Sequence, residues 1–454
     1  MRFFSVLFVL VFSVGAWGQI PVIKLEGQFG YDYQHAELYI FDNGSMARYD
    51  AEVKWRGGST NLDDKHKRNY RIKLSKNVSL FGMREDEDWI LDAGQADVFR
   101  LRNRIATELW NDFAAKPYYH HQEPLARSGV RGQVVEVYLN DEYEGIYSLT
   151  ENMDRKQMRL MKCNSRSGEV FGALWKAKGW GVSTMWRVSP YDNKSELWDN
   201  VEAKYPDLSD LDLLDYSTLY NAIDFVANSS DEEFVNHVHE YFDMPVLIDY
   251  YILLYVLNAF DNMAKNLFWA VYDQTLDKKL TLAVWDLDSS VGQQWVEQFI
   301  LGSSQPDYPM QMDLNLYVRL VKLNADDFNG KVVSRYYNLR KTYLSTSNLI
   351  DRYSSYGQLL QNSGAAKREE QRWSGDSDVG GRVIDFQAEL DYITDWIKRH
   401  MEYLDKYVFV DADKVPTIVM DNDRQIYNLY GQRVDKNSVK RGIYIQGKRK
   451  FISR

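Results

Sequence analysis

The chain has 454 residues, a formal net charge of −10 and no sustained basic tract, which argues against nucleic acid as its main partner. Its single cysteine, Cys163, excludes an internal disulfide, so the burial of apolar side chains has to stabilise the fold. The length is enough for two or three packed units.

The first eighteen residues have the pattern of a signal peptide. Arg2 precedes an apolar run over residues 3–14, and Ala16 and Gly18 place small side chains just before Gln19. An apolar run of this length is too short to cross a bilayer. We therefore expect cleavage after residue 18, a protein that is secreted, periplasmic or attached to the cell surface, and no membrane span after cleavage.

Residues 19–163 are predicted to form a β-rich lobe. Residues 70–74 alternate, which places Ile72 and Leu74 on one face of a strand and Lys73 on the other. Further strands are expected at residues 51–56, 134–139 and 145–149, the last two joined as a hairpin. One helix interrupts them at residues 99–113, where an apolar side chain recurs every four positions.

Residues 164–408 are predicted to form a helical lobe. The stretch 164–207 is polar and irregular, and residues 362–382 have the composition of a mobile loop. Helical periodicity is present at residues 216–228, 231–241, 245–259 and 385–407.

Residues 411–454 differ from the rest of the chain, because short strand patterns alternate with Gly and Asn turns. The strands are expected at residues 416–420, 425–429, 430–434, 442–446 and 448–452. The whole chain is thus predicted to be α+β, with a β-rich lobe, a helical lobe and a small C-terminal β module.

The segment most informative about chemistry follows the predicted helix 245–259. Asp261 and Asn266 have the D-x-x-x-x-N spacing of a kinase catalytic loop, and Asp286 and Asp288 come directly after a predicted hairpin of strands. Phosphoryl transfer needs one carboxylate to orient the attacking hydroxyl, and hard oxygen ligands to hold Mg²⁺. Asp261 would be the base, Asn266 and Asp286 the metal ligands, and Lys265 would contact the moving phosphoryl group.

A structural role is the alternative for each of these residues. An Asp such as Asp261 can cap or end a helix, and this spacing to an Asn also arises by chance. Asp286 and Asp288 are harder to explain in that way, because acids at strand ends commonly face a cleft. Taken together, the set favours a function.

The predicted N-terminal lobe offers groups for the phosphates of a nucleotide. Lys73 could contact them with Glu108 as its partner, although an ordinary solvated lysine is the simpler interpretation. The backbone of residues 57–59 could also approach phosphate, although a Gly-Gly pair is often only a turn. His237 and His239 are two residues apart, which suits a solvated helix face better than a zinc site.

Several motifs in the same order resemble the spore-coat CotH kinase family of atypical secreted protein kinases, over most of the chain up to about residue 408. They are Trp55-Arg56-Gly57-Gly58-Ser59-Thr60, Lys67-Arg68-Asn69-Tyr70-Arg71-Ile72-Lys73-Leu74, Glu87-Asp88-Trp89-Ile90-Leu91, residues 137–147, Lys265-Asn266 and Trp285-Asp286-Leu287-Asp288.

The resemblance implies a two-lobed kinase-like fold, ATP with Mg²⁺ or Mn²⁺, and transfer to Ser or Thr hydroxyls of extracytoplasmic proteins. It assigns Asp261 as the catalytic aspartate, Asn266 and Asp286 as metal ligands with Asp288 beside them, and Glu151 to the neighbourhood of the adenine. It also places Lys73 at the nucleotide, although the same basic strand offers Lys67, Arg68 and Arg71. Arg56 and Ser59, in the motif at residues 55–60, are expected to bind the nucleotide as well.

Other interpretations stay open. The fold could serve a non-catalytic surface, adhesion or coat protein, or the cleft could transfer AMP in place of phosphate. The C-terminal module resembles small β modules that some exported bacterial proteins use for type IX secretion sorting.

Overall fold

The computed structural model of the chain describes residues 19–212, 214–293, 310 and 312–410, together with the backbone of four short strands in the last thirty residues. The chain divides into two compact units, Met1–Phe409 and Val410–Arg454. The predicted signal peptide lies outside the described residues. The α+β class is confirmed, whereas the arrangement as two kinase lobes stays a prediction.

Seven strands of the first unit form a closed barrel in the order β1-β2-β3-β4-β5-β7-β6. β1 closes it by pairing parallel with β6, and the remaining neighbours are antiparallel. The strands are β1 (Val22–Gly27), β2 (Gln34–Asp42), β3 (Ser45–Arg56), β4 (Asn69–Ser79), β5 (Glu85–Asp92), β6 (Gly132–Leu139) and β7 (Glu142–Glu151). The predicted alternation in β4 is confirmed: Ile72 and Leu74 are buried in the barrel core, and Lys73 is exposed.

A second sheet has the order β12-β11-β8-β10-β9. Its strands are β8 (Ala173–Ala177), β9 (Leu197–Trp198), β10 (Val201–Tyr205), β11 (Leu267–Val271) and β12 (Thr281–Val284). The prediction of an irregular stretch at residues 164–207 is wrong, since three strands form there. β8 is too short to show a clear period, and it pairs with β11, which is about ninety residues further along the chain.

Helices make up most of the rest of the first unit. They are α1 (Arg102–Phe113), α2 (Arg155–Met158), α3 (Ser217–Asn228), α4 (Asp231–Tyr241), α5 (Met244–Leu257), α7 (Asn315–Leu323), α8 (Phe328–Arg340), α9 (Thr346–Asn362), α10 (Ala365–Trp373) and α11 (Phe386–Tyr403). The helices predicted within residues 99–259 and 385–407 are confirmed. α4 begins as its sequence suggests, because the Ser230 side chain accepts a hydrogen bond from the Glu233 amide and three acids follow in the first turn.

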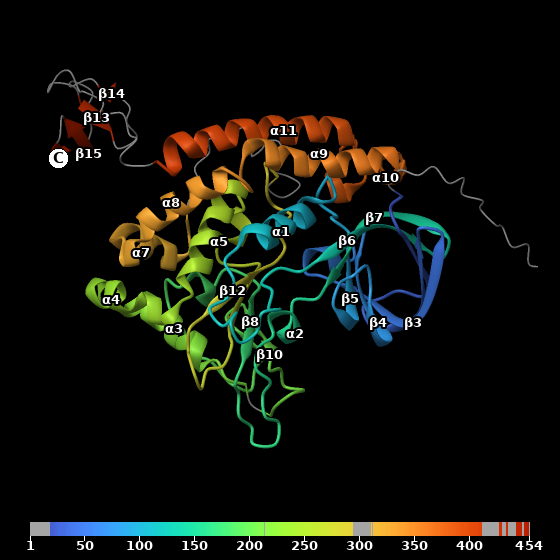
Figure 1. Cartoon of the computed structure of the whole chain (residues 1–454), viewed down its shortest axis with the longest axis horizontal. Helices are drawn as coiled ribbons and strands as arrows, with labels where there is room; N and C mark the ends of the chain where they lie inside the picture. The colour runs from blue at the N-terminus through green and yellow to red at the C-terminus, as the bar shows by residue number, and fades with distance from the viewer. Residues whose placement is uncertain are drawn as a thin grey trace, which may run out of the picture. The chain divides into compact units, whose positions relative to one another are not determined.

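Helix α10 corrects the prediction of a mobile loop at residues 362–382. Polar composition suggested the loop, but the helix lies beside β7 of the barrel (Figure 1) and buries Glu369 and Trp373. The Glu369 carboxylate lies 2.8 Å from Lys67 Nζ and 2.7 Å from Arg100 Nε, and it accepts a hydrogen bond from the Ile146 amide at 2.7 Å. Contacts between residues far apart in the sequence therefore decide this element.

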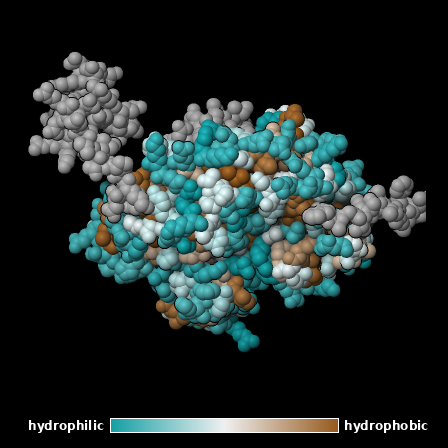
Figure 2. All heavy atoms as spheres, turned by 45° about the horizontal axis from the view of Figure 1, so that its top comes forward, coloured by the Kyte–Doolittle hydropathy of each residue, from teal (hydrophilic) through white to brown (hydrophobic). Residues whose placement is uncertain are grey.

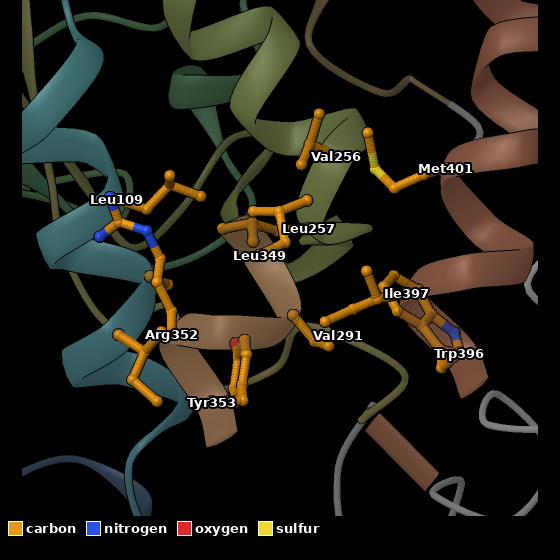
Figure 3. A pocket seen from close by; sticks show the side chains of 12 residues that line it. Leu109, Val256, Leu257, Val291, Leu349, Arg352, Tyr353, Trp396, Ile397 and Met401 are labelled. Carbon is orange, nitrogen blue, oxygen red and sulfur yellow. The ribbon is translucent and has the colours of Figure 1, made fainter. Parts of the chain in front are cut away.

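The predicted apolar stripe of α1 packs against α5, α9 and α11. Figure 3 shows Leu109 of α1, Val256 of α5, Leu349 of α9 and Met401 of α11 pointing toward one another. The space left between them is about 10 Å³, which is too small and too apolar to hold an ordered water. This contact is a packed core and not a ligand site.

On the face drawn in Figure 2, hydrophilic residues predominate and hydrophobic residues form small separate patches. Within the described part of the chain, none of the helices combines the length and the apolar character that a membrane crossing requires.

The second unit contains a four-stranded antiparallel sheet in the order β14-β13-β15-β16. The strands are β13 (Ile426–Asn428), β14 (Arg433–Val434), β15 (Gly442–Gln446) and β16 (Arg449–Ser453). They correspond to four of the five predicted strands; the fifth, at residues 416–420, lies outside the described residues.

Replacing Glu369 with Gln should lower the free energy of unfolding by about 3–5 kcal/mol, because it leaves Lys67 and Arg100 buried without their counter-charge. Burial opposes the charge on Glu369, but the two cations outweigh it and hold the pKa of this carboxyl below its usual range. Urea unfolding at neutral pH measures the loss. Asp395→Asn is the control, since its pair with Arg399 is exposed and should cost no more than about 1 kcal/mol. Equal losses in the two variants would contradict the role of the buried charge.

Candidate active site

The loop after α5 brings the predicted base and the predicted amide ligand into contact. Asn266 Nδ2 donates a hydrogen bond to Asp261 Oδ2 at 2.9 Å, and Lys265 Nζ lies 2.9 Å from Asp261 Oδ1. α5 ends at Leu257; the next residue, Asn258, has a left-handed backbone (φ 51°), and Asn266 adopts the same region (φ 56°). Asn tolerates this conformation better than most residues, so the D-x-x-x-x-N spacing closes a compact loop.

The buried side chain of Asn262 ties this loop to the segment that follows β12. Asn262 is fully buried, and its Nδ2 donates hydrogen bonds to the carbonyls of Trp285 at 2.8 Å and Asp286 at 3.3 Å. Asp286 itself has a left-handed backbone (φ 57°). The two polar loops predicted to cooperate are therefore neighbours.

A cavity of about 130 Å³ opens beside these loops, between the barrel and the second sheet. Charged and polar residues from both sheets and from α1 line it, among them Arg56, Gly57, Gly58, Ser59, Thr60, Asp92, Asn103, Arg104, Lys176, Trp285, Asp286 and Asp288. Four predicted site residues, Arg56, Ser59, Asp286 and Asp288, are in this lining. Asp261, Lys265 and Asn266 are not, and Asn262 connects their loop to Trp285 and Asp286 of the lining.

Two cations flank the indole of Trp285 at this cavity. The Arg56 guanidinium and the Lys176 ammonium each lie 5.5 Å from the ring centre. Burial lowers the pKa of Lys176 to about 8, although the nearby Asp286 carboxylate acts in the opposite direction. Burial likewise lowers the pKa of Arg56. The cavity therefore holds positive charge that is only partly compensated, as a site for phosphate groups requires.

Carboxylates gather on the same cavity. Burial raises the pKa of Asp288 well above its usual range, and the charges of Asp286 and Asp92 add to the shift. The pKa of Asp92 is also raised, by burial and by Asp286. Asn103 of α1 joins the two groups, since its Nδ2 donates to Asp92 at 2.7 Å and its Oδ1 accepts from the Leu287 amide at 2.9 Å. Acids held together against their mutual repulsion favour a bound cation.

The model of the CotH kinase protein family matches residues 53–404, a span that contains the whole lining of this cavity. The chain belongs to the CotH kinase protein family. The resemblance read from the sequence is thereby confirmed, and membership suggests a kinase-like phosphotransferase that uses ATP and a divalent metal. No curated protein matches the chain.

The donor groups of this CotH chain fit a divalent ion carried with ATP. Asn266 and Asp286 offer hard oxygen ligands, with Asp288 next to them. Among the described residues, the carboxylates of the cavity form no group of three whose ligand atoms all lie within 4.8 Å of one another. Such a group occurs elsewhere, at His66, Asp376 and Asp378. Mg²⁺ does not need a cage of this kind, because it commonly binds one or two carboxylates, several waters and the substrate phosphates.

Lys73 of the CotH motifs and its predicted partner Glu108 both lie outside the cavity lining. The Lys73 side chain is 49% exposed, and its nearest carboxylate is Glu87 at 4.0 Å. Glu108 is paired with Arg104 at 3.1 Å and accepts a hydrogen bond from Tyr356, so it is not the partner of Lys73.

Glu151 is buried, forms an ion pair with Arg131 at 2.8 Å and accepts a hydrogen bond from the Arg84 amide at 2.9 Å. These contacts stabilise the end of β7. The assignment of Lys73 and Glu151 to the nucleotide stays a prediction.

Sequence reasoning missed several residues of the cavity, among them Lys176, Asp92 and Asn103. Lys176 had a usable signal, since it is the one charged residue in the apolar strand Ala173–Ala177. Asp92 is the last residue of β5, a position like that of Asp286 after β12. Asn103 had no signal, because an Asn in the first turn of a helix is common and only the fold brings it to both acids.

Lys176→Met should make the protein more stable at pH 7 by about 1–3 kcal/mol. Because burial lowers the pKa of Lys176 from its usual 10.5 to about 8, the unfolded chain binds this proton more tightly than the folded one. The destabilisation caused by burying the charged Lys176 is fully present below pH 8 and disappears as the pH rises toward 10.5. The difference in free energy of unfolding between variant and parent should therefore shrink over that range. Urea unfolding at pH 7 and pH 10 measures it.

The exposed Lys73→Met is the matched control and should show no comparable trend. A Lys176→Met variant that is less stable than the parent at pH 7 would contradict the cost of burial.

Proposed function

We propose that this protein is an extracytoplasmic, metal-dependent kinase that transfers the γ-phosphate of ATP to Ser or Thr hydroxyls of proteins. Membership of the CotH kinase family supports a kinase activity. The observation that carries the finer proposal is the hydrogen bond between Asn266 and Asp261, in a loop that Asn262 joins to Asp286 at the cavity.

Asp261 has the position of the base. It orients the acceptor hydroxyl and takes its proton while the hydroxyl oxygen bonds to the γ-phosphorus, and the bond to the β,γ-bridging oxygen breaks to release ADP. Lys265, 2.9 Å from Asp261, contacts the phosphoryl group as it moves. A divalent ion, when bound with ATP, neutralises charge on the β- and γ-phosphates; Asn266 and Asp286 would hold it, with Asp288 beside them.

The remaining groups of the cavity suit the triphosphate. Arg56 and Lys176 supply positive charge beside the Trp285 ring. The backbone amides of residues 57–59 lie in the same lining and can donate to phosphate oxygens. The protein's work is thus positioning and charge stabilisation, which is most of what phosphoryl transfer requires.

The location outside the cytoplasm rests on the signal-peptide pattern of residues 1–18. The C-terminal module would then serve sorting or surface attachment. This part of the proposal is independent of the chemistry, and the N-terminus of the mature protein in a cell fraction tests it.

The separation of Lys73 from Glu108 favours a second candidate, a non-catalytic surface, adhesion or coat protein. Active kinases use such a pair to hold the nucleotide phosphates. Calorimetry with ATP and Mn²⁺ distinguishes the two candidates, because a non-catalytic scaffold would give neither heat of binding nor a thermal shift.

Asp261→Asn and Asp286→Asn should each reduce phosphoryl transfer by a factor of about 10²–10⁴, because one removes the base and the other a metal ligand. Their melting temperatures should stay close to that of the parent. The assay uses labelled ATP with a mixture of secreted proteins, and the mass of the modified peptides distinguishes phosphoryl from adenylyl transfer.

The exposed Asp50→Asn serves as the control and should retain full transfer. If both cleft variants transferred phosphate as fast as the parent, the proposed mechanism would be wrong.

Lys176→Met should weaken ATP binding by about tenfold or more, since one charged hydrogen bond to phosphate contributes 1.5–3 kcal/mol in general. Lys73→Met should change the affinity little, because its side chain is exposed and outside the cavity lining. Calorimetric titration with ATP and Mn²⁺ compares the two. The opposite order of effects would restore Lys73 as the phosphate lysine.

A further inference from the structure

The loop between β3 and β4 connects the candidate active site to a second cluster of polar side chains. Its first residues, Gly57–Thr60, line the cavity. Its last residues carry His66, which lies against the segment between α10 and α11 that contains Asp376 and Asp378. This cluster lies outside the lining of the candidate active site.

Three side chains converge there from two distant parts of the chain. His66 Nδ1 lies 2.8 Å from Asp376 Oδ2. Asp378 Oδ2 accepts hydrogen bonds from the backbone amides of His66 at 2.9 Å and Lys67 at 2.8 Å. Each of the three residues offers one ligand atom, and these atoms all lie within 4.8 Å of one another.

A buried carboxylate oxygen in this cluster lacks a partner. Asp378 is 3% exposed, yet no group within the described part of the chain donates a hydrogen bond to its Oδ1. Its other oxygen is already used by the two backbone amides. Buried carboxylate oxygens are normally paired or bound to a metal, so the free oxygen points to a ligand.

We propose that His66, Asp376 and Asp378 bind a divalent transition-metal ion, of which Zn²⁺ is the best match. One imidazole with two carboxylates is a donor set suited to Zn²⁺, whereas Ca²⁺ and Mg²⁺ prefer oxygen ligands alone. The His66 side chain is 56% exposed, which leaves room for water as a further ligand. Small movements of the two carboxylates would bring all three donors to Zn²⁺ bonding distances of about 2.0–2.2 Å.

The ion would act as a clamp on the cavity loop. His66 belongs to the loop that carries Gly57–Thr60, and Asp376 and Asp378 belong to the segment that follows α10. The next residue after His66, Lys67, is already held to α10 through Glu369 at 2.8 Å. Metal binding would therefore fix the exposed loop 57–66 to a part of the chain that is itself anchored to the barrel.

A proton on His66 is the competing occupant. The hydrogen bond that the His66 ring donates to Asp376 raises the pKa of His66, and nearby Arg68 opposes the shift. The carboxylates thus favour positive charge at this place, which either a proton or a metal ion can supply. An imidazolium–carboxylate pair would bind no metal, and the experiment separates the two.

The experiment titrates the purified full chain, freed of metal by a chelator and dialysis, with Zn²⁺ in competition with a chromophoric indicator. The expected result is one tightly bound Zn²⁺ per chain and a rise in melting temperature on its addition. His66→Gln and Asp376→Asn should each weaken binding by at least about tenfold. In the Co²⁺ form, the visible absorption bands of the bound ion should disappear with His66→Gln.

Two controls locate the ion. His237→Gln changes an exposed histidine paired with a single carboxylate, Glu240 at 3.0 Å, and should bind Zn²⁺ like the parent. Asp286→Asn changes the cavity of the candidate active site and should also leave Zn²⁺ affinity unchanged. This binding measurement does not depend on phosphoryl transfer, so failure of the kinase proposal would leave it standing.

Equal Zn²⁺ affinity of His66→Gln and the parent would overturn the proposal, as would the absence of any Zn²⁺-dependent thermal shift. If Asp286→Asn alone lost Zn²⁺ affinity, the ion would be bound in the cavity of the candidate active site, and the proposal would again be wrong. The metal-free melting temperatures of parent and variants show whether each variant is folded.

Discussion

The buried amide of Asn262 is the constraint on which the candidate site depends. Its hydrogen bonds to the carbonyls of Trp285 and Asp286 hold two loops together that are separated by a pair of strands. The pairing of Leu267 with Val284 brings the two loops to the same end of the β11–β12 hairpin, and the Asn262 amide fixes them to each other there. Leaving a buried amide N–H without an acceptor is costly, so these bonds favour the observed arrangement of the two loops.

Around this tie, the cavity combines charges of both signs at close range. Arg56 and Lys176 bring positive charge from the barrel and the second sheet, and Asp92, Asp286 and Asp288 bring negative charge. Neither set is neutralised completely, as the displaced pKa values of Lys176, Asp92 and Asp288 indicate. A polyanionic nucleotide with its metal ion would satisfy both sets together, which is the physical basis of the kinase proposal.

Buried charge also joins the helices to the barrel. Glu369 on α10 is bound by Lys67 and Arg100, and the same loop end carries His66 into contact with Asp376. Residues 57–60 line the cavity, and the far end of their loop is therefore held by α10 and by the segment after it. A metal ion at that point would act on the cavity without touching the reacting groups.

The sequence alone determined the strands with clear alternation, the helices α1, α3, α4, α5 and α11, and the spacing of Asp261, Asn266 and Asp286, because each depends on a local period or a short motif. It also determined the family, because several motifs recur in order. Only the tertiary structure decided that residues 164–207 contain strands, that residues 365–373 form a helix, and that Asn103 belongs to the cavity while Lys73 does not. These outcomes depend on partners far along the chain, and no local pattern encodes which distant side chain will bury a charge or complete a sheet.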